Sequence, residues 1–186
     1  MIKVTGTSLD GVVIIDPLVH GDERGFFFES FHQAKFAEAG IDAAFVQTNI
    51  SRSSRGVLRG LHYQHPHAQG KLVTVLEGEV YDVAVDIRPS SPTFGQWTAA
   101  MLSDINRRHF WIPPGFAHGF CVVSDAATFM YQCTTLYDPS ADAAIRWDDP
   151  AIGVDWPVSE PVLSRKDLVA PLLADVPRDR LPDIHQ

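Results

Sequence analysis

Most of the chain consists of short runs in which hydrophobic and polar residues alternate, or in which β-branched and aromatic residues cluster, as in β-strands. In the clearest run, residues 79–87, alternate positions from Tyr81 to Ile87 are hydrophobic and share one face. Asp82 and Asp86 lie on the other face, which we expect to be solvated. Glycine and proline separate the runs and predict turns. The expected strands are residues 12–15, 26–31, 44–50, 57–63, 71–76, 79–87, 94–102, 109–112, 118–123 and 128–135.

Helical patterns are confined to two short segments. One covers residues 32–39 and ends at Gly40, and the other is a single turn after Ser164 that carries Asp167. Many short strands with few helices predict an all-β fold. For a chain of this length we expect a jelly roll, a β-sandwich or barrel with few open sheet edges and a few short helices. Functional polar residues should point into its mouth.

The chain of 186 residues is long enough for one domain with its own hydrophobic core. We expect this domain to span residues 1–170, and residues 171–186, rich in proline and charge, to form an irregular C-terminal tail. No apolar run reaches the roughly 18 residues that a membrane span requires. The first residues lack the basic-then-apolar pattern of a secretory leader, so we expect a cytoplasmic protein.

The net charge of −8 argues against non-specific nucleic-acid binding, which requires a basic face. The negative net charge does not exclude an anionic small ligand, since a few local cations can hold a phosphate. The two cysteines, Cys121 and Cys133, lie in apolar strand-like runs without a CxxC spacing. We expect buried reduced thiols, as is usual in the cytoplasm, although a disulfide between the two stays open.

The densest polar segment, residues 56–71, contains three histidines. His65 and His67 have an H-x-H spacing that lets one strand offer two imidazoles to a metal ion, with His118 as a later ligand. Lys71 stands where a jelly-roll metal site would need a carboxylate, and its ammonium repels a divalent cation and cannot ligate while protonated. We therefore favour a polar surface loop for His65 and His67 over a metal site.

His62 lies inside the expected strand 57–63 and is either a hydrogen-bonded core residue or a catalytic base. The cations Arg59 and Lys71 favour a base that acts on a phosphate-bearing or enolate-forming substrate, and an apolar strand offers the phenol of Tyr131. Arg59 and His62 are three positions apart, so a regular strand places them on opposite faces. Both can reach one pocket only if Gly60 bends or bulges the strand, which glycine permits.

A hairpin loop followed by an aromatic run lies nearer the N-terminus. We expect Phe26 and Phe28 to belong to a core strand. Arg24 and Glu29 flank this aromatic run and are candidates for ligand contacts. A further pair of amides, suited to reading the edge of a planar base, shares one face of the next strand: Gln47 and Asn49.

Eight short motifs follow one another along the chain and leave only its end uncovered. They are D-x-R-G-F-F-x-E at 22–29, Q-x-N-x-S at 47–51, G-V-L-R-G-L-H-Y-Q at 56–64, Q-x-K-L-V at 69–73, D-V-A-V-D-I-R at 82–88, S-P-T-F-G-x-W at 91–97, P-x-G-F-A-H-G-F at 113–120 and L-S-x-K-D at 163–167. One such motif is modest evidence, whereas eight in order are specific. The chain resembles the dTDP-4-dehydrorhamnose 3,5-epimerases, which are jelly-roll, cupin-type enzymes.

This resemblance implies inversion at C3 and C5 of dTDP-4-dehydro-6-deoxy-D-glucose, giving dTDP-4-dehydro-L-rhamnose, through an enolate formed beside the C4 ketone. It implies that His62 is the base and that Asp167 orients the imidazole and stabilises its charged form. Lys71 faces the C4 oxygen, where negative charge develops. Tyr131 returns a proton from the opposite face of the sugar. No metal or redox cofactor is implied.

The resemblance also implies a homodimer with exchanged N-terminal strands, in which one subunit supplies part of the other's nucleotide site. Arg59 and Arg24 correspond to diphosphate ligands, and Tyr137 to an aromatic residue that stacks on thymine. Asp142 departs from the family, which usually has Glu there, and puts that contact in doubt. The remaining implied substrate contacts are Phe27, Glu29, Gln47, Asn49, His118 and Lys166.

Three other interpretations remain open. A close relative could invert only C3 or only C5, or act on another nucleotide-linked 4-keto sugar. The chain could be a metal-dependent cupin, or a non-catalytic module that binds sugar nucleotides. The metal-dependent alternative would use four histidines, namely His62, His65, His67 and His118.

Overall fold

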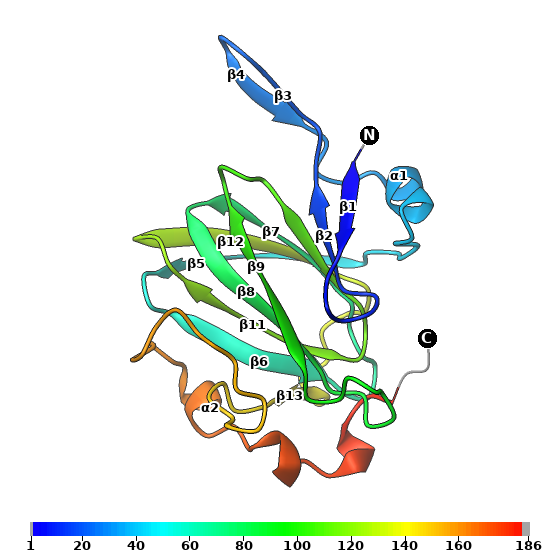
Figure 1. Ribbon diagram of the computed structural model, residues 1–186, viewed down its shortest axis with the longest axis vertical. Coiled ribbons are helices and arrows are strands. Elements are labelled where there is room, and N and C mark those ends of the chain that lie inside the picture. Colours follow the sequence, from blue (N-terminus) through cyan, green and yellow to red (C-terminus); the bar gives the residue numbers. More distant parts are fainter. Residues whose placement is uncertain (1, 184–186) are drawn as a thin grey trace.

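The computed structural model describes residues 2–183 and shows two antiparallel β-sheets packed face to face, with a separate β-hairpin (Figure 1). The six-stranded sheet has the order β1 (Lys3–Gly6), β2 (Val13–Asp16), β10 (His109–Ile112), β7 (Lys71–Glu77), β12 (Ala126–Cys133) and β5 (Gln47–Ser54). The five-stranded sheet has the order β13 (Asp142–Ala144), β6 (Leu58–Gln64), β11 (Phe116–Val122), β8 (Glu79–Asp86) and β9 (Trp97–Ser103). This sandwich confirms the predicted cupin-like jelly roll.

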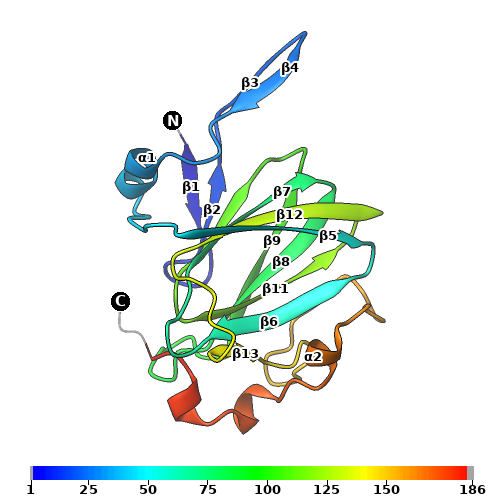
Figure 2. The same ribbon diagram turned by 180° about the vertical axis from the view of Figure 1, so that it is seen from behind.

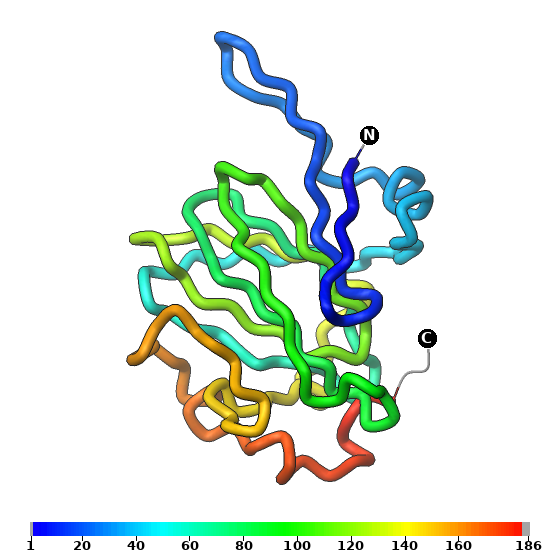
Figure 3. Tube along the Cα trace, in the orientation of Figure 1, coloured from blue at the N-terminus to red at the C-terminus, as the bar shows by residue number. Residues whose placement is uncertain are grey.

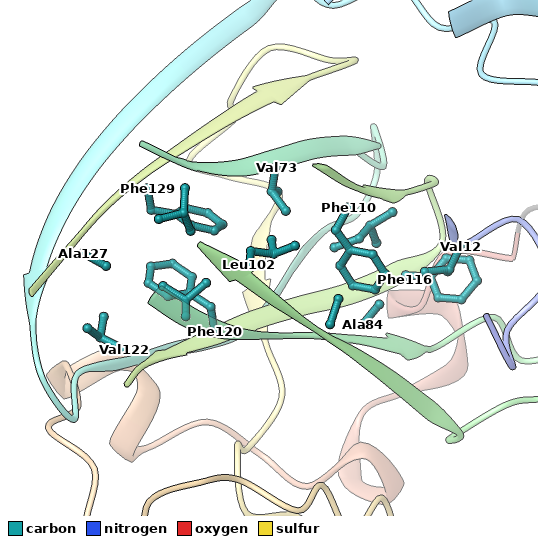
Figure 4. Packing of buried hydrophobic residues seen from close by; sticks show 14 of the residues in the cluster. Val12, Val73, Ala84, Leu102, Phe110, Phe116, Phe120, Val122, Ala127 and Phe129 are labelled. Atoms are coloured by element: carbon teal, nitrogen blue, oxygen red, sulfur yellow. The ribbon is translucent and has the colours of Figure 1, made fainter. Parts of the chain in front are cut away.

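The main hydrophobic core lies between the two sheets (Figure 4). Phe120 of β11 and Phe129 of β12 stack across the interface with ring centroids 4.2 Å apart. All seven residues of β11 are buried, because this strand lies in the interior of its sheet and both of its faces are covered.

Asp82 and Asp86 were predicted to be solvated, and this prediction is wrong, because both residues are fully buried. They share a face of β8 with Val80 and Ala84, which point into the main core. The opposite, hydrophobic face of β8 packs against the C-terminal part of the chain instead of against the other sheet. Each carboxylate has a cationic or imidazole partner there, namely His118 for Asp82 and Arg88 for Asp86.

The hairpin of β3 (Val19–Asp22) and β4 (Gly25–Phe28) projects from the sandwich, as the tube in Figure 3 shows. The expected core strand 26–31 is therefore wrong in two respects: it ends at Phe28, and Phe26 is 59% exposed. A two-stranded ribbon has no second layer to cover it within one chain. The guanidinium of Arg107 lies over the Phe26 ring at 3.8 Å.

Two short helices occur where they were predicted. Helix α1 (Gln33–Glu38) buries Phe36 beside Ile15 and Trp111 on the outer face of the six-stranded sheet, and Gly40 follows with φ of 89°. Helix α2 (Arg165–Leu168) begins after Ser164, whose Oγ accepts a hydrogen bond from the Asp167 amide at 3.2 Å.

The predicted C-terminal tail packs against the outer face of the five-stranded sheet over its described part (Figure 2). It contains two 3-10 turns, Leu173–Asp175 and Arg178–Arg180, and buries Leu173 and Leu181. None of the helices within residues 2–183 is long and apolar enough to cross a membrane. Both cysteines are buried and free, which excludes the disulfide that the sequence left open.

Candidate active site

A pocket with a volume of about 260 Å³ opens between the two sheets. The six-stranded sheet contributes side chains from β5, β7 and β12, and the five-stranded sheet contributes side chains from β6 and β13. The lining residues are Gln47, Asn49, His62, Tyr63, Gln64, Gln69, Lys71, Tyr131, Cys133, Tyr137 and Asp142.

His62 on β6 forms a hydrogen-bonded pair with Asp167 of α2, with 2.6 Å between His62 Nε2 and Asp167 Oδ1. Asp167 is 1% exposed, and its second oxygen accepts a hydrogen bond from Ser164 Oγ at 2.7 Å. Burial by itself raises the pKa of Asp167, but the hydrogen bonds from His62 and Ser164 outweigh it and keep that pKa below its usual value. The carboxylate therefore holds a proton on His62 Nε2, which leaves Nδ1 free to accept one.

An irregularity in the pairing of β6 with β11 brings Arg59 and His62 to the same side, whereas a regular strand would place them on opposite faces. His62 pairs with His118, but Arg59 pairs with Phe120, so three steps along β6 match two along β11. Gly60 lies at this shift with φ of 128°, and a Cβ there would lie 2.5 Å from the Gly119 Cα. Only glycine fits such a position without displacing the neighbouring strand.

Arg59 reaches from β6 across to β5, where its Nη2 donates a hydrogen bond to Ser53 Oγ at 3.0 Å. Ser53 lies on the same face of β5 as Gln47 and Asn49, because alternate residues of a strand share a face. The guanidinium thus lies on the same side of β5 as those two amides, although Arg59 is not among the residues that line the pocket.

Tyr131 and Lys71 come from the wall opposite His62. Strand β12 pairs with both β5 and β7, so that Tyr131 lies opposite Asn49 and Val73. Burial raises the pKa of Tyr131, which keeps the phenol protonated and able to donate a proton. Burial also lowers the pKa of Lys71, since an ammonium loses hydration inside the sandwich.

His118 was predicted to contact the substrate, but its side chain does not line the pocket. Its Nε2 lies 3.0 Å from Asp82 Oδ1, and its ring stacks on Phe129 with centroids 6.1 Å apart. His118 is buried as the β11 neighbour of His62, behind the pocket wall.

Three predicted contact residues meet at the pocket rim. Asp142 Oδ2 accepts hydrogen bonds from Tyr137 Oη at 3.2 Å and from Lys166 Nζ at 2.5 Å. This bridge links the loop after β12 to helix α2, which also carries Asp167. The Asp142 side chain is one methylene shorter than the glutamate usual in the resembled family, but it is long enough for these two contacts within the chain.

Three other predicted residues are not brought to this pocket. Arg24 and Phe27 lie on the projecting hairpin and Glu29 lies just after it, on the opposite side of the sandwich from α2 (Figure 1). Arg24 pairs with Asp22 at 2.5 Å, and Glu29 pairs with Lys35 at 2.8 Å. Phe27 is 68% exposed.

The sequence interpretation missed four lining residues, of which Tyr63, Gln64 and Gln69 lie in the quoted motifs and Cys133 does not. His65 and His67 lie outside the pocket lining, and His67 is exposed in a loop with φ of 67°. Across residues 2–183, no group of three or more histidine, cysteine, aspartate or glutamate side chains is arranged to hold a metal ion.

Comparison with known proteins gives concordant matches. A family model described as dTDP-4-dehydrorhamnose 3,5-epimerase matches residues 6–175. The enzyme of that name from Methanothermobacter thermautotrophicus is 56% identical over 164 residues, which is 87% of this chain and 89% of the relative. The Shigella flexneri enzyme of the same name is 55% identical over 168 residues, covering 89% of this chain and 93% of the relative.

Among solved structures, the dTDP-6-deoxy-D-glucose-3,5-epimerase from Legionella pneumophila, in complex with dTDP-4-keto-L-rhamnose, superposes with a TM-score of 0.97. The two chains are 52% identical, and the match covers 100% of each. Sequence and fold therefore agree over almost the whole length, and the chain belongs to the dTDP-4-dehydrorhamnose 3,5-epimerase family of isomerases.

Proposed function

We propose that this chain inverts C3 and C5 of dTDP-4-dehydro-6-deoxy-D-glucose to give dTDP-4-dehydro-L-rhamnose. One observation carries the proposal: an imidazole backed by a buried carboxylate lies on one wall of the pocket, and a protonated phenol lies on the other. Family membership and the sugar bound by the Legionella enzyme support the same substrate class.

The first half of each inversion is removal of a proton. The hydrogens on C3 and C5 lie next to the C4 ketone, so either can leave as a proton and give an enolate. His62 Nδ1 accepts the proton, and Asp167 stabilises the imidazolium that forms. Lys71 lies in the pocket where its ammonium stabilises the negative charge that develops on the C4 oxygen.

The second half is return of a proton to the other face of the ring, since return to the same face would regenerate the starting sugar. Tyr131 comes from the sheet opposite His62 and supplies this proton. The resulting phenolate takes a proton from water, and the His62 imidazolium releases its proton to water, so that both groups are restored before the next inversion.

In this proposal the sugar ring fills the pocket and the nucleotide lies at its rim, in contact with lining residues that the sugar does not cover. About 260 Å³ is less than the roughly 300–1,000 Å³ of pockets that enclose larger ligands, so it suits a single sugar ring. Arg59 binds the diphosphate, Tyr137 stacks on thymine, and Gln47 and Asn49 contact the base and ribose, all on the same side of the sandwich.

We also propose a homodimer in which each projecting hairpin completes the site of the other subunit. The hairpin carries exposed Phe26 and Phe27, which one chain leaves uncovered. Arg24, Phe27 and Glu29 do not line the pocket of their own chain, and the partner supplies them instead. The two free thiols fit a reducing compartment, so we place the enzyme in the cytoplasm.

The test is product NMR with the thymidine-linked keto sugar in heavy water. Deuterium at both C3 and C5, with the L-rhamno product, is the expected result. Deuterium at one carbon would instead identify a mono-epimerase, and none at either carbon would identify a binding module.

His62→Ala should lower turnover by about a hundredfold to ten-thousandfold, since it removes the base. Binding of dTDP, measured by calorimetry, should change little because His62 contacts only the sugar. Substantial epimerisation by this variant would remove His62 from the role of base.

Tyr131→Phe should keep part of the deuterium exchange but lose most of the inverted product, because the base still forms the enolate while the opposite face lacks its acid. The ratio of exchange to product, followed by NMR, is the informative quantity. A normal ratio would assign the acid to another group.

A further inference from the structure

Gln64 is buried and lies two residues after His62 on β6, so the two side chains share a face. Its amide is fully used by backbone groups of two loops. Nε2 donates to the carbonyl of His67 at 2.6 Å and to that of Leu136 at 3.3 Å, and Oε1 accepts from the Asp138 amide at 2.9 Å.

The bonds to Leu136 and Asp138 hold the two residues on either side of Tyr137, which lies outside any helix or strand. The Tyr137 amide itself donates to Gln47 Oε1 at 2.8 Å. Three consecutive backbone units are thus held by side-chain amides, one from each sheet. The loop has no regular hydrogen-bond ladder here, so these amides fix the backbone that carries the half-exposed tyrosine ring, while Tyr137 Oη donates to Asp142 at the pocket rim.

We propose that Gln64 is a positioning residue that sets nucleotide affinity through Tyr137. The inference rests on the proposed function, in which Tyr137 stacks on the nucleobase. Gln64 and His62 lie on the same strand. One strand thus carries the catalytic base that acts on the sugar and the amide that positions Tyr137 at the nucleotide.

The chemistry of the contact explains why glutamine is required. An amide both donates and accepts, and this site offers two carbonyls and one N–H. A carboxylate could accept from the Asp138 amide but would face two carbonyl oxygens with no proton to donate. A leucine could make none of the three bonds and would leave these backbone groups unpaired.

The test measures KM and kcat for the keto sugar and calorimetric affinity for dTDP. Gln64→Leu and Gln64→Glu should each raise KM and weaken dTDP binding by about tenfold or more, as expected from loss of three and two hydrogen bonds respectively, with kcat within a few-fold. Gln132→Leu is the matched control, because Gln132 lies on β12 on the opposite face from Tyr131 and outside the pocket lining.

A double-mutant cycle separates positioning from a general structural role. If Gln64 acts through Tyr137, adding Gln64→Leu to Tyr137→Ala should weaken dTDP binding little further. Additive losses, or a fall in kcat at unchanged KM, would overturn the inference. Gln64→Glu has nearly the native volume and keeps the test available if the leucine variant fails to fold.

The measurement of dTDP binding also distinguishes the proposed function from the inference about Gln64. If wild-type protein binds dTDP but leaves the sugar unchanged, the proposed function fails while the role of Gln64 can still be measured. If the enzyme is active but both Gln64 variants bind dTDP normally, only the inference about Gln64 fails.

Discussion

A single buried residue, His109, shows how the surroundings of a side chain set its protonation state. His109 on β10 is 2% exposed, packs edge-on against Phe28 and Phe36, and has its Nε2 3.0 Å from Ser30 Oγ. Its Nδ1 has no partner among the described residues. Burial lowers its pKa from 6.5 to about 4, so the ring is neutral in the folded protein. His109 thereby ties the segment between the hairpin and α1 to the sandwich in an acid-sensitive way.

Stability should fall as pH decreases from about 6.5 to about 4, because in this window the unfolded chain binds a proton at His109 that the folded chain excludes. The contribution is roughly 3 kcal/mol at most. Urea unfolding at pH 7 and at about pH 4 measures it. A His109→Asn variant, which cannot titrate, should show a shallower pH dependence, and an unchanged slope would show that other groups dominate acid sensitivity.

At the scale of elements, the irregular pairing of β6 with β11 does most to shape the pocket. It turns Arg59 and His62 to one side and places His62 beside α2, where Asp167 meets it. The shift depends on two facing glycines, Gly60 and Gly119, whose backbones approach too closely for a side chain.

Gly60→Ala should destabilise the fold by roughly 2–4 kcal/mol, since the methyl group would meet the backbone of β11 and the residue would keep a left-handed φ. Turnover should fall as well, because relief of the clash moves His62. Gly56→Ala is the matched control: Gly56 also has a positive φ, of 77°, but open space at its Cβ, so only about 1 kcal/mol should be lost. Denaturant titration compares the two, and equal losses would refute the steric argument.

The molecule consists of a sandwich, which contains the His62–Asp167 pair, and of a hairpin that projects away from the sandwich and does not line its pocket (Figure 3). A pocket sized for one sugar ring and a hairpin with exposed aromatic rings are complementary halves of a dimeric site in the arrangement proposed above. In a symmetric dimer each such contact occurs twice.

Mixing two defective variants tests this arrangement. Arg24→Ala should weaken substrate binding, and His62→Ala should abolish turnover. If the hairpin completes the partner's site, a heterodimer has one site with both defects and one intact site. Coexpression in equal amounts with random pairing should then restore about a quarter of wild-type activity. If heterodimers purified with two different tags show no recovery of activity, each chain uses its own hairpin.

Local sequence patterns determined most strands and both helices, because these depend on alternation and capping that neighbouring residues set. Ser164 and Asp167 illustrate this, since the predicted helical turn and its cap are only three residues apart. The ordered motifs likewise sufficed to predict the family and the main pocket residues His62, Lys71 and Tyr131.

Alternation along β8 showed which residues share a face, but it carried no information about which face would be interior. Only the tertiary structure decided that Asp82 points into the core, because the C-terminal segment covers the hydrophobic face. The exposure of Phe26 was decided in the same way. The pairing of His62 with Asp167, 105 positions apart, followed from the family resemblance but from no local pattern. Burial and long-range contact depend on which layers pack together, and residues near in sequence do not determine that.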